Sequence, residues 1–164
     1  MQLPIQLPIQ PPQTNLIAAI DPDLHKPGLA VWDRARKKWL CHKAIANDEV
    51  KAFLLDHFDK PDLTIYIEAG WKHKKANFRG GYGAAAHTIA KKVGENHAMG
   101  KFLSTQLQKA GFIVIEIPPL EKKQLKVEGK WTPMGRCYVR DATGIASPIN
   151  DDVRDALMIV LHFR

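Results

Sequence analysis

The chain has 164 residues, of which 45% are hydrophobic and 25% are charged, so it fits one globular domain with a sizeable core. Lysine and arginine number 24 against 17 aspartates and glutamates, which gives a net charge of +7. This excess favours a polyanionic partner such as nucleic acid, although a basic protein with a solvated surface has the same balance. No apolar run is long enough to cross a bilayer, so we expect no membrane partner.

The cysteines and the N-terminal sequence indicate the cellular compartment. Cys41 and Cys137 lie far apart and form no CxxC or zinc-type pattern, which is typical of free thiols in a reducing environment. The N-terminus has prolines where a signal peptide would have a charged segment and an unbroken apolar run. These features predict an intracellular, cytoplasmic protein.

The first 14 residues differ in composition from the rest. They repeat QLPI and contain four prolines, a composition that favours extended chain over packed structure. We interpret residues 1–14 as a flexible proline- and glutamine-rich arm and residues 15–164 as a single folded domain.

Five short apolar segments predict the strands of one α/β sheet. The first three follow one another closely, so we expect an antiparallel meander, and helical segments separate the later ones. We therefore expect a mixed five-stranded sheet with helices on both faces. The predicted strands are Leu16–Ile20, Leu29–Asp33, Trp39–Ile45, Leu63–Ile67 and Phe112–Ile117.

Helical spacing of apolar residues predicts the remaining elements. Glu49–Phe58 follows Asn47 and Asp48, either of which can cap a helix. Residues 84–93 and 95–110 are helical in pattern and can be continuous through Gly94, and residues 150–163 form the last helix. Residues 131–148 have no clear period, and the sequence assigns them no structure.

Acidic residues stand at the ends of two predicted strands, Asp21 after the first and Glu68 after the fourth. Neighbouring parallel strands present their carboxyl ends at one edge of a sheet, so these acids would converge if the strands are adjacent. Each alone has a simpler explanation, because Asp21-Pro22 is typical of a turn and Glu68 of a surface position.

A second pair of acids, Asp152 and Asp155, lies three residues apart at the start of the last helix and on one side of it. The helix dipole favours acids there without any function. Like charges beside an apolar face repel each other, however, and a divalent cation would relieve that repulsion. Asp151 can be the helix start, an extra ligand or a bystander.

Basic and aromatic residues alternate in the segment 69–83, and a further basic stretch covers 120–130. Positive groups can contact phosphates while aromatic rings stack on unpaired bases. A flexible surface loop and a solvated helix face are the respective alternatives. The candidate nucleic-acid contacts are Trp71, Lys72, Lys74, Lys75, Phe78, Arg79, Tyr82, Lys122 and Lys126.

The order of the acids resembles that of the RuvC-type Holliday junction resolvases, within the ribonuclease-H-like nuclease superfamily. IDPDLHKPGLAVWD is similar to the family's opening hairpin motif, TIYIEAG to its strand ending in the second acid, and DDVRDALMIVLH to its terminal helix. The resemblance implies a ribonuclease-H-like fold. It places Asp21, Glu68, Asp152 and Asp155 in metal-binding and catalytic positions and Lys123 near the scissile phosphate.

The chain departs from the family pattern in three places. Asp23 stands where the family usually has glycine, and Ala19 replaces another glycine, which can alter the first turn without removing Asp21. Residues 131–149 do not resemble the family's segment before the final acids. This leaves the second basic contact and the substrate preference open.

The resemblance implies a crossover junction endodeoxyribonuclease of DNA recombination and repair, which resolves four-way junctions by paired phosphodiester hydrolysis. Carboxylates suit Mg²⁺, with Mn²⁺ as an alternative, and two ions can activate water and stabilise the leaving oxygen. The family's resolvases act as homodimers on branched DNA, which implies a dimer here. Two alternatives stay open: a related nuclease acting on RNA or other branched DNA, and a non-catalytic nucleic-acid-binding module of the same fold.

Overall fold

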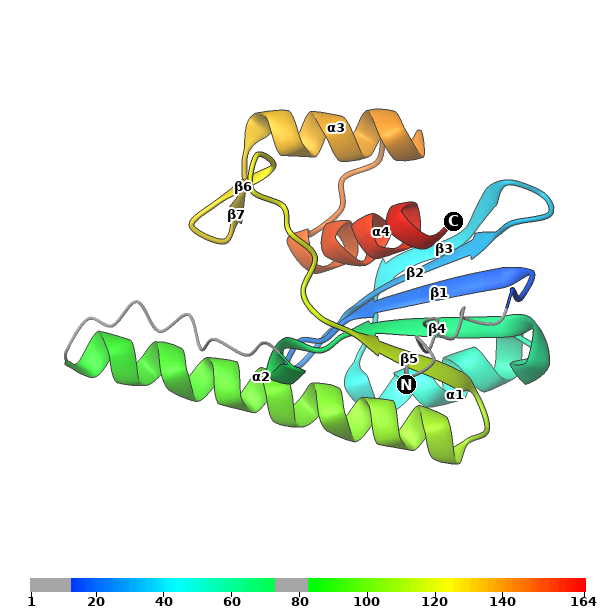
Figure 1. The fold of residues 1–164 in the computed structure, drawn as a ribbon, viewed down its shortest axis with the longest axis horizontal. Helices are drawn as coiled ribbons and strands as arrows, with labels where there is room; N and C mark the ends of the chain where they lie inside the picture. The colour runs from blue at the N-terminus through cyan, green and yellow to red at the C-terminus, as the bar shows by residue number, and fades with distance from the viewer. Residues whose placement is uncertain (1–12, 73–82) are drawn as a thin grey trace, which may run out of the picture.

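A five-stranded mixed sheet forms the centre of the computed structural model, which describes residues 13–72 and 83–164 (Figure 1). Its strands are β1 (Leu16–Asp21), β2 (Gly28–Asp33), β3 (Lys38–Ala44), β4 (Leu63–Glu68) and β5 (Ile113–Ile117). They lie in the order β3-β2-β1-β4-β5. The first three pair antiparallel, whereas β4 runs parallel to β1 and β5 parallel to β4. The predicted mixed sheet is confirmed.

Helices cover both faces of this sheet, as predicted (Figure 1). α1 (Asn47–His57) and α2 (Ala84–Lys109) pack on one face, and α2 is continuous through Gly94. α4 (Asp151–Phe163) packs on the other face and carries α3 (Pro133–Thr143) on its outer side. In the described part of the chain, no helix combines the length and the apolar character needed to span a bilayer.

β1 is buried on both sides because helices cover both faces of the sheet. Ile17, Ala18, Ala19 and Ile20 are all 0% exposed. Ala18 and Ile20 join the core beneath α1 and α2, whereas Ile17 and Ala19 join the core beneath α3 and α4. A strand buried on both faces is continuously apolar, and this is the pattern that predicted it. β1 thereby fixes the position of Asp21, the residue at its end.

The N-terminus of α4 lies directly against β2. A Cβ atom at Gly28 would lie 2.0 Å from the carbonyl oxygen of Asp152, so only glycine permits this approach. Asn150 caps the helix, because its side-chain oxygen accepts a hydrogen bond of 2.8 Å from the Val153 N–H. These two contacts place the first turn of α4 beside the carboxyl end of β1.

The segment that the sequence left unassigned forms a helix. In α3, Thr132 caps the N-terminus, Pro133 occupies the first turn and Gly144 ends the helix with a φ of 72°. These are typical start and stop signals, and the helix is amphipathic, so both its ends and its apolar side could have identified it. The preceding hairpin pairs β6 (Lys126–Val127) with β7 (Lys130–Trp131), and no sequence pattern predicted it.

Two details near the predicted boundaries differ from expectation. Thr14 is 8% exposed and donates a hydrogen bond of 2.8 Å to the Thr64 hydroxyl, so the ordered structure includes the last residues assigned to the arm. Residues 1–12 lie outside the described residues. The predicted cap of α1 is wrong, because the Asn47 amide instead donates to the carbonyls of Asp23 and Leu24. Asn47 therefore holds the β1–β2 loop in place.

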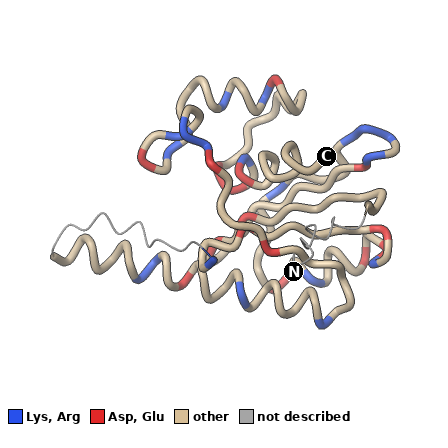
Figure 2. Tube along the Cα trace, viewed as in Figure 1, with Lys and Arg blue, Asp and Glu red and all other residues tan. Residues whose placement is uncertain are grey.

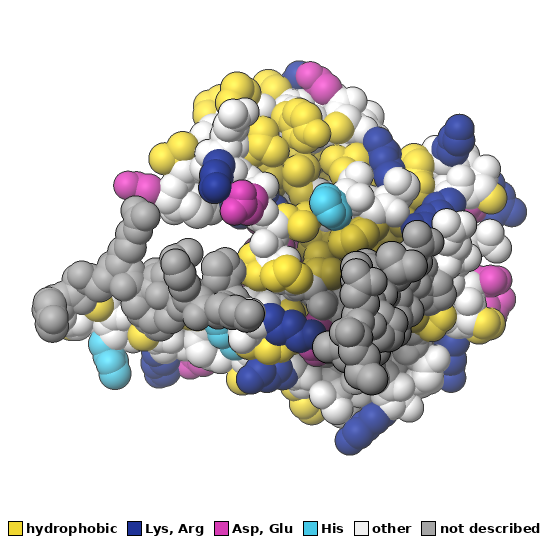
Figure 3. All heavy atoms as spheres, in the orientation of Figure 1, with side chains coloured by type: hydrophobic (Ala, Val, Ile, Leu, Met, Phe, Trp, Pro, Cys, Tyr) yellow, Lys and Arg dark blue, Asp and Glu magenta, His cyan; other side chains and the backbone are white. Residues whose placement is uncertain are grey.

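α3 is less buried than α4. Seven α4 residues are buried, whereas only two α3 residues are. Hydrophobic side chains gather on the surface over α3 and the hairpin before it (Figure 3), and Val127, Met134 and Tyr138 are each about half exposed or more. α4 therefore contributes most of the core on this face of the sheet.

Gly28→Ala should destabilise the protein by about 1–3 kcal/mol or more, because the new methyl group must displace the backbone of α4. Gly94→Ala is the matched control. A Cβ atom at position 94 of α2 would have no atom of the described residues within 4 Å beyond the helix's own backbone, so this substitution should stabilise the helix by about 0.5–1 kcal/mol. Urea unfolding of both variants measures the difference. Equal stability of Gly28→Ala and wild type would contradict the close approach of α4 to β2.

Candidate active site

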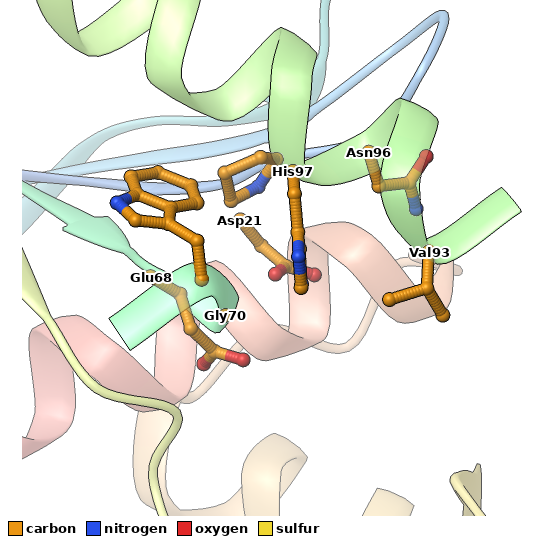
Figure 4. A pocket seen from close by; sticks show the side chains of 8 residues that line it. Asp21, Glu68, Gly70, Val93, Asn96 and His97 are labelled. Atoms are coloured by element: carbon orange, nitrogen blue, oxygen red, sulfur yellow. The ribbon is translucent and has the colours of Figure 1, made fainter. Parts of the chain in front are cut away.

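Asp21 and Glu68 converge at one edge of the sheet, as the sequence predicted. β1 and β4 are parallel neighbours, and Ile20 is paired with Ile67, so the next residue on each strand is the acid. Both carboxylates line a cavity of about 160 Å³ (Figure 4). The strand register therefore places the two acids side by side.

α4 brings the second pair of acids to the same edge, and Figure 2 shows acidic positions gathered there. Asp155 is 5% exposed, whereas Asp152 is only partly buried. The contact of α4 with Gly28 fixes the distance between its first turn and the strands. The four acids thus come from three separate elements of the fold.

Two of the four acids, Asp21 and Asp152, have a raised pKa. Burial raises the pKa of Asp21 well above its usual value, and the charges of Glu68 and Asp155 raise it further. The pKa of Asp152 is also raised, first by burial and then by repulsion from Asp23 and Asp155. Such repulsion makes a concentrated acidic site costly for the folded protein unless a positive group lies nearby.

Two lysines supply that positive charge. The Lys122 Nζ lies 2.5 Å from Asp155 Oδ1 and 3.3 Å from Glu68 Oε2, and its side chain is 7% exposed. The Lys126 Nζ lies 2.6 Å from Asp155 Oδ2, and the Trp131 indole N–H donates to the same oxygen at 3.3 Å. Burial acts to lower the pKa of Lys122, but Glu68 and Asp155 outweigh it and hold that pKa above its usual value.

Lys123, which the resemblance placed near the scissile phosphate, is not brought to the acidic cluster. Its side chain is 80% exposed and forms an ion pair of 3.1 Å with Glu121. The Lys126 N–H donates to the Lys122 carbonyl at 2.9 Å, so this one-turn bend directs residues 122 and 126 to the same side. Lys122 and Lys126, and not Lys123, are therefore the lysines of this segment that the structure places among the acids.

The donor chemistry of the cluster fits a hard divalent cation, because it consists of carboxylate oxygens. The residues that would hold such a cation are Asp21, Glu68, Asp152 and Asp155. Across residues 13–72 and 83–164, no three His, Cys, Asp or Glu side chains are arranged around a common point closely enough to bind an ion. The Lys122 ammonium lies between Glu68 and Asp155 and neutralises part of their charge.

The wall of the cavity opposite the acids comes from α2 and from the turn after β4 (Figure 4). Trp71 packs closely on α2, since a Cβ atom at Gly100 would lie 2.5 Å from its ring. Val93, Asn96 and His97 line the cavity from the helix. These three residues were not predicted as site residues. Residues 93, 96, 97 and 100 form one stripe at helical spacing, but spacing alone does not indicate which stripe of the helix meets the acids.

The structure places the predicted nucleic-acid contacts in different surroundings. Trp71 lines the cavity, and Lys72 forms an ion pair of 2.9 Å with Glu116 on β5. Lys122 and Lys126 contact carboxylates in this structure. The others, Lys74, Lys75, Phe78, Arg79 and Tyr82, lie outside the described residues.

Two further acids lie beside the cluster. Asp151 is the first residue of α4, pairs with the Arg154 guanidinium and is 51% exposed, so of the roles left open the structure favours that of helix start. The Asp23 carboxylate accepts hydrogen bonds from the N–H groups of His25 and Lys26 at 2.9 and 3.0 Å. The residue that departs from the family's glycine thus closes the turn through its own side chain.

Asp21→Asn should stabilise the protein at pH 7 in the absence of divalent ions. The folded pKa of Asp21 is raised above its usual 3.8, so stability falls as pH rises from about 3.8 through the folded value. Asparagine removes this loss, and Tm should rise by about 2–4 °C, with the difference shrinking toward pH 4.

Thermal unfolding across this pH range measures the effect. The control is Asp56→Asn, at an exposed position of α1, which should leave Tm unchanged. A lower Tm for Asp21→Asn at pH 7 would show that the Asp21 charge is stabilising.

No protein-family profile and no curated protein sequence matches the chain. Among solved structures it is similar to T. thermophilus RuvC in complex with a Holliday junction substrate, with a TM-score of 0.54, 18% identity and coverage of 89% of this chain and 90% of that one. A second Thermus thermophilus RuvC structure gives a TM-score of 0.51 and 19% identity, covering 89% and 91% of the two chains. These likenesses extend over most of each chain, and they show that this protein has a RuvC-like, ribonuclease-H-like fold.

Proposed function

We propose that this protein is a metal-dependent nuclease that hydrolyses phosphodiester bonds in branched DNA, with four-way junctions as its principal substrate. The convergence of Asp21, Glu68 and Asp155 at one sheet edge is the observation that carries this proposal. The RuvC-like fold supports it, because one of the similar structures is a complex with a Holliday junction. The net charge of +7 agrees with a polyanionic substrate.

The acids have the role of holding the metal in this proposal. Asp21, Glu68, Asp152 and Asp155 would bind Mg²⁺ or Mn²⁺, and we propose two ions for the site. Bound metal would supply activation of the attacking water and stabilisation of the leaving oxygen. The strand register and the Gly28 contact orient these carboxylates before any substrate arrives.

Other residues would bind the DNA. Carboxylates repel a phosphate backbone, and the neighbouring Lys122 and Lys126 would offset that repulsion. Trp71, in the cavity wall, has an aromatic ring of the kind on which unpaired bases stack. We therefore assign the cavity beside the acids to DNA near the branch point.

Junction resolution requires paired cuts, and two copies of the chain would supply two acidic clusters. We therefore propose a homodimer as the active form. Simultaneous labelling of two strands of a synthetic four-way junction tests this, because a dimer should give symmetric nicks within one binding event.

Asp21→Asn and Asp155→Asn should each reduce junction cleavage by about 100-fold or more, because the metal site contributes several kcal/mol of transition-state stabilisation. The measurement is single-turnover nicking of a labelled junction in Mg²⁺, with a chelator-treated sample in parallel. Asp56→Asn is the matched control and should cut at the wild-type rate. If Asp21→Asn cuts as fast as wild type, the proposed site is incorrect.

A substrate panel separates the two alternative functions. Wild type should cut the four-way junction faster than a flap, a linear duplex or an RNA–DNA hybrid of the same sequence. Faster cleavage of the hybrid or the flap would indicate a related nuclease with another substrate. Junction binding without cleavage of any substrate would indicate a nucleic-acid-binding module.

A further inference from the structure

Asp155 is enclosed by positive and polar donors from the segment after β5. Lys122 contacts one of its oxygens at 2.5 Å and Lys126 the other at 2.6 Å, while Trp131 donates to the second oxygen as well. Lys122 also reaches Glu68 at 3.3 Å and thereby bridges α4 and β4. A cation bound to these two carboxylates would therefore have to share them with the Lys122 ammonium.

Lys122 lies in a segment that forms neither helix nor strand. Residues 118–125 contain no helix or strand and connect β5 with the short hairpin of β6 and β7. The lysine stem has four methylene groups and three rotatable donors on its ammonium, so the group can turn to another anion that replaces the carboxylates as its partner. A phosphodiester of bound DNA is such an anion.

We propose that Lys122 is a tethered counterion that competes with the metal for Glu68 and Asp155 and is drawn away by the phosphate of the bound DNA. This inference rests on the proposed function. Metal binding to the free protein is then weak, because a divalent ion meets a positive charge at its own position. DNA and metal bind cooperatively, since each favours the state in which Lys122 has left the carboxylates.

The position of Lys122 distinguishes it from the lysine next to it. Lys122 is 7% exposed and lies among carboxylates, whereas Lys123 is 80% exposed and pairs only with Glu121 among the described residues. Both carry one positive charge. Exchanging either for glutamine alters the net charge equally, so a difference between the two variants reports on the location of the charge.

The experiment is a calorimetric titration of the full-length protein with Mg²⁺ alone, without DNA. Lys122→Gln should bind Mg²⁺ about tenfold more tightly than wild type, because a unit charge within about 4 Å of the ion is removed. Lys123→Gln should bind as wild type does, and Lys122→Arg, which keeps the charge, should bind weakly. Asp155→Asn added to Lys122→Gln should abolish the gain.

Lys126→Gln provides a second variant if thermal unfolding shows that Lys122→Gln is poorly folded. It removes the other lysine from Asp155 at a more exposed position, so Mg²⁺ affinity should again increase. In wild type, the Mg²⁺ concentration for half-maximal junction cleavage should lie below the Kd for Mg²⁺ of the free protein.

The Mg²⁺ affinities of the variants separate the counterion role of Lys122 from the nuclease function. If Mg²⁺ binding depends on Asp155 but is no tighter in Lys122→Gln and Lys126→Gln, then the counterion inference is overturned and the nuclease proposal stands. If neither wild type nor any lysine variant shows binding that depends on Asp155, both are overturned. If Lys123→Gln tightens binding as much as Lys122→Gln, the effect is one of net charge, and the inference is overturned.

Discussion

The parallel pairing of β1 with β4 is the constraint on which the candidate site depends. It places Ile20 opposite Ile67, and both strands are buried on both faces, so a slip of one residue would exchange the side chains that fill the two cores. The same register sets Asp21 beside Glu68. Core packing and site geometry are therefore determined by one set of backbone hydrogen bonds, and neither can change without the other.

Concentrating four acids at this edge opposes folding, as the raised pKa of Asp21 and Asp152 indicates. The basic segment that follows β5 in the chain offsets part of this charge, because Lys122 and Lys126 contact Asp155. Sites that concentrate like charge are commonly less stable than the structure around them, because function requires the charge that folding disfavours. The strands and α4 are well buried and supply the compensating stability.

Much of the fold and part of the site could be predicted from the sequence, for identifiable reasons. The strands were recognisable because burial on both faces requires continuous apolar runs, and Asp21 and Glu68 because they interrupt such runs. The sequence did not show that Lys122, and not Lys123, lies among the acids. That depends on the direction of a bend in the chain, which only the folded structure reveals. His97 and Asn96 were missed for a similar reason: a helix has several faces, and only packing selects the one that meets the acids.

The contact between Gly28 and the carbonyl of Asp152 divides the site into two mechanical parts. A backbone-to-backbone contact has no rotamers, so β1, β2, β4 and the first turn of α4 form a rigid frame with no side chain that can relax between them. The segment 118–126 packs Leu120 and Leu125 against the core on this face, but it reaches the carboxylates through long lysine side chains. The backbone positions of the four acids are therefore fixed by the frame, and the longer lysine side chains have the greater freedom to adjust to an ion or a DNA strand.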